Sequence, residues 1–190
     1  SQMLLAAGAI AGMLAAVPAY AQETVKIGLI LPMTGGQAST GKQIDNAVKL
    51  YMRQNGDTVA GKKIEIILKD DGYNPGRAVA NFNEMKDQVF AVIGTVGTAV
   101  LNANKDLIAD SGLPLVYPLG NVQVFAKMPR EKTRCVFQAY PDYTDEAEFI
   151  VQQASKVEGV KKFGFFGQND DFGKDALVGV KKGLAKVPGA

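Results

Sequence analysis

The 190-residue chain has no histidine, a single cysteine and almost no excess charge, and each of these features removes a class of function. Without imidazole, a Ser-His-Asp triad, a Cys-His pair and histidine metal sites are excluded within this sequence. Lys and Arg total 21 against 19 Asp and Glu, and no basic run is interleaved with aromatic residues, so we expect no nucleic-acid partner. Cys135 lies in the strand-like run TRCVFQAY, which favours a small buried hydrophobic residue over a nucleophile without a base.

The sequence also lacks an apolar run long enough for a membrane helix. LLAAGAIAGMLAAV is apolar throughout, but it is shorter than the roughly 20 residues that a span needs. Pro18 ends it, and Ala19-Tyr20-Ala21 follows as an A-x-A cleavage pattern before Gln22. This order predicts a secretory signal peptide over residues 1–21, cleaved after Ala21, although the usual positive segment is absent. The residue immediately after the cleavage point, Gln22, is not a cysteine, so we expect a soluble periplasmic product that is neither lipid-anchored nor membrane-embedded.

From Thr24 onward, apolar strand-like runs alternate with amphipathic helical runs. The strand-like runs are VKIGLILP, KKIEIILKDD, FAVIGT and LPLVYP, and the helical runs between them span about 42–53, 75–86 and 100–110. This alternation predicts right-handed βαβ units and a parallel sheet with helices on both faces, which makes the fold class α/β. Asn74-Pro75 predicts a capped helix start, and Gly56 and Gly112 predict helix ends.

The pattern changes after Tyr117. A loop rich in Lys and Arg, residues 127–134, precedes the strand-like run CVFQAY. A helix is then predicted from about Tyr143 to Val157, and its apolar residues share one face: Ala147, Ile150, Val151, Ala154 and Val157. A new cycle begins with the strand-like run KKFGFFG and a helix over about 174–186.

Tyr140-Pro141 is interpreted as the crossing between two lobes, because a proline ends the strand and the pattern restarts after it. Residues 22–140 would then form the first lobe and residues 141–190 the start of a second. One strand cannot bury both of its faces, so the sequence is interpreted as a fragment. We expect residues 22–190 alone to be prone to aggregation.

The stretch VIGTVGTAVLNAN, residues 92–104, is the turn most suited to a ligand. In open parallel sheets, ligands bind outside the carboxyl ends of the strands, and here a strand breaks at Gly94 just before a predicted helix. Glycines allow close approach, Thr98 supplies a hydroxyl, and the helix start offers free N–H groups and the positive end of its dipole. The turn suits an anion, either phosphate or carboxylate. The alternative is that Thr98 only caps the helix.

Neither glycine-rich turn matches a nucleotide-binding motif. GTVGTA lacks the Lys-Ser/Thr of a P-loop and does not match G-x-G-x-x-G, and no Ser or Thr follows Gly41-Lys42 in TGGQASTGK. Asp70-Asp71 ends a strand, where paired acids can hold Mg²⁺. The preferred interpretation is a pair of solvated acids that close the strand before a capped helix. We expect neither a cofactor nor a metal.

Five stretches carry a resemblance that covers about Val25 to Ala190: IGLILPMTGGQASTGKQIDNAVKL, IEIILKDDGYNPGRAVA, VIGTVGTAV, LPLVYPLGN and FGQNDDFGKDAL. Their order and spacing resemble the N-terminal half of the leucine/isoleucine/valine-type periplasmic substrate-binding proteins of ABC transporters. The resemblance implies a two-lobed type I periplasmic-binding-protein fold, here an incomplete chain, whose lobes close over a small-molecule ligand. It also implies an ABC transporter permease as partner.

The same resemblance implies ligand-binding residues in the first lobe. A ligand carboxylate would be held by the hydroxyl of Thr98 and by main-chain N–H groups of the turn at Gly97. An amino group would be met by main chain and side chain around Leu119, Gly120 and Asn121. Thr40 would lie against the ligand side chain.

From the second lobe, the resemblance implies Phe172 as an apolar or aromatic lid, and the alternative is that Phe172 packs in a core. This sequence departs from the family pattern in two visible places. The best-known members carry a disulfide where Tyr73 and Gly97 stand here, and a hydroxyl is common where Asn121 stands. The acidic residue that usually neutralises the amino group belongs to a part of the second lobe that this sequence does not include.

We therefore expect an exported solute-binding protein, not an enzyme, that captures a small hydrophobic amino acid or a related carboxylate for an ABC transporter. Hinge closure across Tyr140-Pro141 would trap the ligand. A carboxylate without an amino group stays open as the ligand. Two alternatives remain: a ligand-sensing ectodomain of a receptor, since one fold can serve several functions, and, less favoured, a nucleotide-binding Rossmann-type enzyme.

Overall fold

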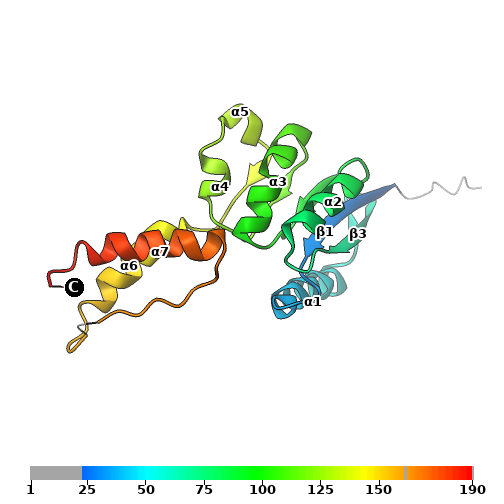
Figure 1. Ribbon diagram of the computed structural model, residues 1–190. Helices are drawn as coiled ribbons and strands as arrows, with labels where there is room; N and C mark the ends of the chain where they lie inside the picture. Colours follow the sequence, from blue (N-terminus) through cyan, green and yellow to red (C-terminus); the bar gives the residue numbers. More distant parts are fainter. Residues whose placement is uncertain (1–22, 161, 190) are drawn as a thin grey trace, which may run out of the picture.

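The computed structural model describes residues 23–160 and 162–189, so the predicted signal peptide and its cleavage point lie outside the described residues. Within them, one sheet has the strand order β2-β3-β1-β4-β5-β6; Figure 1 shows β1 and β3 side by side in it. Neighbouring strands are parallel except β2 and β3, which form an antiparallel pair. The strands are β1 Thr24–Leu31, β2 Thr58–Val59, β3 Lys62–Asp70, β4 Ala91–Ile93, β5 Leu115–Val116 and β6 Val136–Phe137.

Helices connect the parallel strands, as the alternation in the sequence predicts. Asn74 caps the second helix by accepting the Arg77 N–H, and Pro75 occupies its first turn. Gly112 ends the third in the left-handed conformation, which confirms that helix end. The helices are α1 Ala38–Asn55, α2 Pro75–Met85, α3 Thr98–Ser111, α4 Gln123–Ala126, α5 Arg130–Thr133, α6 Tyr143–Ala154 and α7 Asp171–Leu184.

One face of the sheet packs against α1. Successive residues of a strand point to opposite faces, so Leu29 and Leu31 of β1 share this face. They form a buried cluster with Val96. Partly buried side chains of α1 and β3 pack against that cluster: Ile44, Val48, Ile66 and Leu68. Gly41 permits the close approach of α1, since a Cβ at Gly41 would lie 2.2 Å from the carbonyl oxygen of Pro32.

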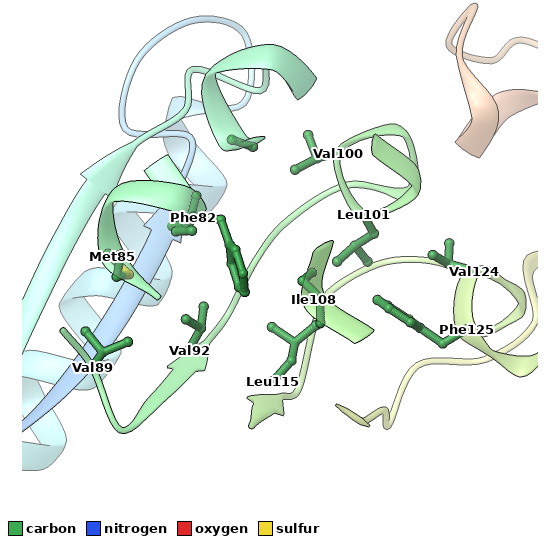
Figure 2. Packing of buried hydrophobic residues seen from close by; sticks show 12 residues of the cluster. Phe82, Met85, Val89, Val92, Val100, Leu101, Ile108, Leu115, Val124 and Phe125 are labelled. Carbon is green, nitrogen blue, oxygen red and sulfur yellow. The ribbon is translucent and has the colours of Figure 1, made fainter. Parts of the chain in front are cut away.

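The other face of the sheet packs against α2 and α3. Ile30 points to this face between the two leucines of β1 and belongs to the larger buried cluster. Figure 2 shows these side chains gathered between the strands and the helices. The cluster includes Phe82 and Met85 of α2, Val100, Leu101 and Ile108 of α3, Val92 of β4, Leu115 of β5, and Val124 and Phe125 of α4. Helices therefore cover both faces, and the predicted α/β class is confirmed.

Beyond Pro141, α6 and α7 lie side by side (Figure 1). Glycines of α7 set this close packing, because a Cβ at Gly179 would lie 2.1 Å from the Thr144 carbonyl oxygen and one at Gly183 would lie 2.8 Å from Cβ of Val151. Val151 is buried in this contact, as its place on the predicted apolar face of α6 requires. The division into lobes at 140/141 stays a prediction.

Other sequence predictions for this region are wrong. The run KKFGFFG forms no strand over residues 162–167, because a strand needs a neighbouring strand and the described residues supply none beside it. Ile150 and Val157 of the predicted apolar face are 57% and 61% exposed.

The prediction for Cys135 is also wrong. Cys135 is half-buried rather than buried, since it lies just outside the two-residue strand β6 at the sheet edge. Among the described residues, no helix is long and apolar enough to cross a membrane.

Candidate functional site

A cavity of about 330 Å³ lies at the carboxyl ends of the central strands. β1 sits between β3 and β4, and the chain leaves β1 toward β3 but leaves β4 toward β5, so the two loops diverge at this point. A divergence of this kind is where open α/β sheets bind ligands. Its lining comes from loops of the sheet, the 140–146 region and the start of α7: Gln37, Thr40, Tyr73, Val96, Gly97, Thr98, Leu119, Tyr140, Tyr143, Glu146, Gln168 and Phe172. Three larger grooves also occur in the described part of the chain: two, of about 510 and 740 Å³, are lined by other residues, and one of about 430 Å³ adjoins the cavity and shares Tyr143, Glu146 and Phe172 with it.

The structure brings most of the predicted ligand-binding residues to this cavity. Those that line it are Thr40, Gly97, Thr98, Leu119 and Phe172. Gly120 and Asn121 do not line it. Gly120 packs behind the cavity, where a Cβ would lie 2.5 Å from Cδ1 of Leu101. Ligand contact by any of these residues stays a prediction.

The turn before α3 is built from main-chain hydrogen bonds. The Gly97 N–H donates to the Leu119 carbonyl at 2.8 Å, and the Leu119 N–H donates to the Thr95 carbonyl at 2.8 Å. Gly97 has φ +109 and is the cap residue of α3, a conformation that favours glycine. The first N–H groups of a helix have no acceptor within the helix, so the start of α3 presents donors beside the cavity.

Thr98 is the first residue of α3 and its side chain is buried. Its Oγ1 accepts the main-chain N–H of Asn121 at 3.2 Å, and it makes no capping hydrogen bond within the described residues. The alternative that Thr98 only caps the helix is therefore wrong, because Gly97 occupies the cap position.

Asp70 joins the loop after β1 to the loop after β3. Its carboxylate accepts the Thr34 hydroxyl at 2.6 Å and the N–H groups of Met33 and Gly72 at 2.8 Å each. Arg77 also donates to it, from Nη2 at 3.1 Å. The Thr34 hydrogen bond is the largest cause that holds the pKa of Asp70 below its ordinary value. Asp70 therefore fixes the two loops relative to each other. The described residues contain no group of three or more His, Cys, Asp or Glu side chains that could hold a metal ion.

Asp71 is fully buried, so the predicted pair of solvated acids is wrong for this residue. Its Oδ1 accepts the Tyr73 N–H at 2.8 Å, while its Oδ2 has no hydrogen-bond partner among the described residues. Burial raises the pKa of Asp71 above its ordinary value. The chain turns sharply after Asp71, which places the second acid in the interior while the first stays at the loop surface.

Tyr73 and Gly97, the two positions where the resemblance implies a disulfide, lie against each other. A Cβ at Gly97 would lie 2.6 Å from Cε2 of the Tyr73 ring, so the ring needs a glycine beneath it. The Tyr73 hydroxyl lies 3.4 Å from both Oε1 of Gln168 and Oδ2 of Asp170. Burial, followed by the charge of Asp170, raises the pKa of Tyr73 to about 12, so its hydroxyl stays protonated and donates.

Aromatic rings form the side of the cavity beyond Pro141. Tyr143 packs edge-to-face on Phe172 with ring centroids 4.9 Å apart, and Tyr140 packs on Tyr143 at 6.0 Å. Phe172 is 37% exposed and lines the cavity, which favours the predicted lid position over a core position. Burial raises the pKa of Tyr143, so its hydroxyl also stays neutral.

Among the described residues, Glu146 is the acidic residue in the lining, and no Lys or Arg of that part of the chain lines the cavity with it. It lies in the first turn of α6 and makes no ion pair within the described residues. Sequence reasoning overlooked Glu146 together with Tyr73, Tyr140 and Tyr143. Their positions offered a clue, because Tyr73 follows a strand end and the other three flank the predicted hinge.

Comparison with known proteins identifies the family. The sequence model of the periplasmic binding proteins matches residues 24–189, and the chain belongs to that family. A Leu/Ile/Val-binding protein homolog from Brucella melitensis is 31% identical over 173 residues, covering 88% of this chain and 45% of that relative. The predicted resemblance is thereby confirmed.

Solved structures agree. A solute-binding protein of an ABC transporter from Rhodopseudomonas palustris BisB5, in complex with 3,4-dihydroxybenzoic acid, has TM-score 0.72 and 36% identity, covering 86% of this chain and 45% of that one. A leucine-binding protein from Thermotoga maritima has TM-score 0.73 at 22% identity, covering 85% and 46%, and shares the fold. The type I periplasmic-binding-protein fold is therefore confirmed. The chain spans less than half the length of these relatives.

Proposed function

We propose that the protein is an exported solute-binding protein that captures a small carboxylate and delivers it to the permease of an ABC transporter. The observation that carries the proposal is the cavity at the diverging strand ends, where the α3 start and Thr98 meet aromatic rings and Glu146. Binding there involves no bond making or breaking. The predicted signal peptide supports export to the periplasm.

The ligand class follows from the chemistry of the lining. A carboxylate suits the hydroxyl of Thr98 and the free N–H groups of α3, because helix starts attract anions. Apolar and aromatic side chains such as Phe172 and Tyr143 suit a hydrophobic body. Glu146 suits a second polar group that donates hydrogen bonds, either an ammonium group or a hydroxyl.

The relatives support this combination. The Brucella relative is named for leucine, isoleucine and valine, and the Rhodopseudomonas structure holds 3,4-dihydroxybenzoic acid. Both kinds of compound carry a carboxylate at one place and a hydrogen-bond donor at another. We therefore propose a hydrophobic amino acid or a hydroxylated aromatic acid as the ligand.

Closure of the lobes would complete capture. Tyr140-Pro141 joins the sheet to α6, and Phe172 at the start of α7 already faces the cavity. A ligand that touches residues on both sides of this joint stabilises the closed state over the open one, because only the closed state makes both sets of contacts. We propose that this preference traps the ligand until the permease receives it.

A thermal-shift screen of the full-length protein tests the proposal. The ligands are leucine, phenylalanine, benzoate, 3,4-dihydroxybenzoate, ATP and NAD. A bound ligand raises the melting temperature by mass action, and we expect a shift with an amino acid or a hydroxylated benzoate. Thr98→Val keeps the side-chain shape without the hydroxyl and should reduce the shift, whereas Thr133→Val on α5 should preserve it. A shift with nucleotides alone would refute the carrier proposal.

A further inference from the structure

The side chain of Asn121 points away from the cavity and is fully engaged elsewhere. It is buried, its Nδ2 donates to Oδ2 of Asp175 at 2.6 Å, and its Oδ1 accepts the Gln123 N–H at 3.0 Å. Its main-chain N–H donates to Oγ1 of Thr98 at 3.2 Å. Asn121 therefore connects Thr98 at the start of α3 to Asp175 in the second turn of α7.

The hydrogen bond from Asn121 determines what the Thr98 hydroxyl can do. A hydroxyl carries one hydrogen and two acceptor lone pairs. Since Oγ1 already accepts from Asn121, its own hydrogen is available, and no acceptor for it occurs among the hydrogen bonds of the described residues. A ligand carboxylate is an acceptor only, so the hydroxyl is prepared for the partner that the proposed function requires.

A second hydrogen bond between an asparagine and an aspartate of α7 provides a comparison. Nδ2 of Asn102, on α3, donates to Oδ2 of Asp171 at the start of α7 at 2.8 Å. Among the side-chain hydrogen bonds of the described residues, none joins Asn102 to the Thr98 hydroxyl. The Asn121–Asp175 and Asn102–Asp171 pairs therefore both hold α7 to the first lobe, but only the former also orients the Thr98 hydroxyl.

We propose that Asn121 is a positioning residue that couples carboxylate capture at Thr98 to the seating of α7 through Asp175. The inference rests on the proposed function, because it requires that Thr98 hold the ligand carboxylate. It also changes the role of Asn121: the residue acts on the ligand through Thr98, not through direct contact of its amide. Movement of α7 toward the first lobe fixes the position of the Asn121 main chain, and the N–H of that main chain fixes the orientation of the Thr98 hydroxyl.

The coupling predicts non-additive substitutions in the full-length protein. Asp175→Ala should weaken binding of leucine or 3,4-dihydroxybenzoate roughly tenfold, because it removes a hydrogen bond to a charged group. In a Thr98→Val background, Asp175→Ala should weaken binding by less than a further factor of roughly two, because the hydroxyl that Asn121 and Asp175 orient is already absent. Asp175→Asn retains a side-chain oxygen that can accept from Asn121 and should recover most of the affinity. Asn102→Ala is the matched control, and its effect should add to that of Thr98→Val.

Isothermal titration calorimetry with leucine and 3,4-dihydroxybenzoate measures the affinity of each variant and so tests whether the effects are additive. Additive effects of Asp175→Ala and Thr98→Val would overturn the inference, as would equal coupling of Asn102→Ala to Thr98→Val. If Asp175→Ala does not fold, Asp175→Leu and Asn121→Ser provide the same cycle with Thr98→Val.

Hydrogen exchange separates failure of the inference from failure of the proposed function. If neither probe binds the parent protein, the proposed ligand class is wrong. The linkage can still be measured without ligand, because Asp175→Ala should speed amide exchange in residues 119–123 while Asn102→Ala should leave it unchanged. Unchanged exchange in Asp175→Ala would overturn the linkage independently of any ligand.

Discussion

Asp71 carries a carboxyl in a position where a charge is costly. Its pKa is raised by burial, so ionisation in the folded state costs free energy once the pH exceeds the unfolded value near 4. That cost is absent at lower pH and grows as the pH rises toward the folded pKa. Asp71→Asn removes the charge and keeps an acceptor for the Tyr73 N–H.

We therefore expect the stability of Asp71→Asn relative to the parent protein to improve between pH 4 and pH 7, by on the order of 1 kcal/mol. Chemical denaturation at the two pH values measures this change. Asp70→Asn is the control, because the pKa of Asp70 is lowered and its stabilisation is lost only as the pH falls below about 4, so its relative stability should change little between pH 4 and pH 7. A relative stability of Asp71→Asn that does not change with pH would contradict the prediction.

Glu146 should discriminate among ligands by their hydrogen-bond donors. Glu146→Gln removes the negative charge from the lining, so binding of leucine should weaken roughly tenfold while binding of benzoate, which has no second donor, should not weaken. Competition binding with the two ligands measures the difference. Glu148→Gln on the same helix is the control, since Glu148 pairs with Lys186 outside the cavity lining. Equal losses for both ligands would show that Glu146 acts only on the fold.

At the scale of elements, α1 depends on a glycine that helix propensity alone would disfavour. Ala normally stabilises a helix by roughly 0.5–1 kcal/mol over Gly. At Gly41 a Cβ would lie 2.2 Å from the Pro32 carbonyl oxygen, a main-chain atom that cannot rotate away. We expect Gly41→Ala to destabilise the protein by about 2 kcal/mol, measured by thermal or chemical denaturation.

Gly36→Ala, in the turn before α1, is the matched control, because its Cβ would meet no atom within 4 Å. Its stability should stay within a few tenths of a kcal/mol of the parent value. A stable Gly41→Ala protein would mean that α1 can shift on the sheet at little cost.

The elements that sequence reasoning predicted well are those whose side chains repeat with one clear period. β1 alternates Leu29, Ile30 and Leu31 between two cores, and α2 carries a cap that the sequence displays openly. The run 161–167 is as apolar as a strand, but pairing depends on a neighbour that composition does not reveal. The two-residue strand β2 and the four-residue helices α4 and α5 were also hidden, because they contain no full period. The two-residue strands β5 and β6 lie within the predicted strand-like runs LPLVYP and CVFQAY.

The residues that line the cavity were likewise predicted where a local sequence pattern marks them and missed where only the tertiary structure brings them together. Thr98 was found because it belongs to a local pattern, a strand end followed by glycine and a helix start. Tyr143 and Glu146 reach the cavity only because the chain crosses from the sheet to α6, and the sequence does not specify that geometry. The hydrogen bond between Asn121 and Asp175 was not predicted, because the two residues lie 54 positions apart in the sequence.

At the scale of the molecule, the face of α6 and the 163–166 segment expose an apolar groove of about 430 Å³. Phe166 is fully exposed and Ile150 is 57% exposed. We expect a polypeptide of residues 23–190 to bind the dye ANS there, because the dye becomes fluorescent on exposed apolar surface. Ile150→Ser combined with Phe166→Ser should reduce the fluorescence several-fold, as measured by titration with the dye.

Leu50→Ser is the control for this surface, since Leu50 is an exposed apolar residue of α1 outside the groove. It should leave most of the dye signal. A comparable decrease in Leu50→Ser would mean that the dye binds without preference for the groove.

The packing of Tyr73 on Gly97 has a consequence for how the protein matures. The loops on either side of the cavity are held by a ring on a glycine, in the place where the resemblance implies a covalent bridge, and this chain contains one cysteine. Packing of these two loops against each other therefore requires no thiol oxidation. Dithiothreitol should leave this contact between the two loops unchanged, because no disulfide takes part in it.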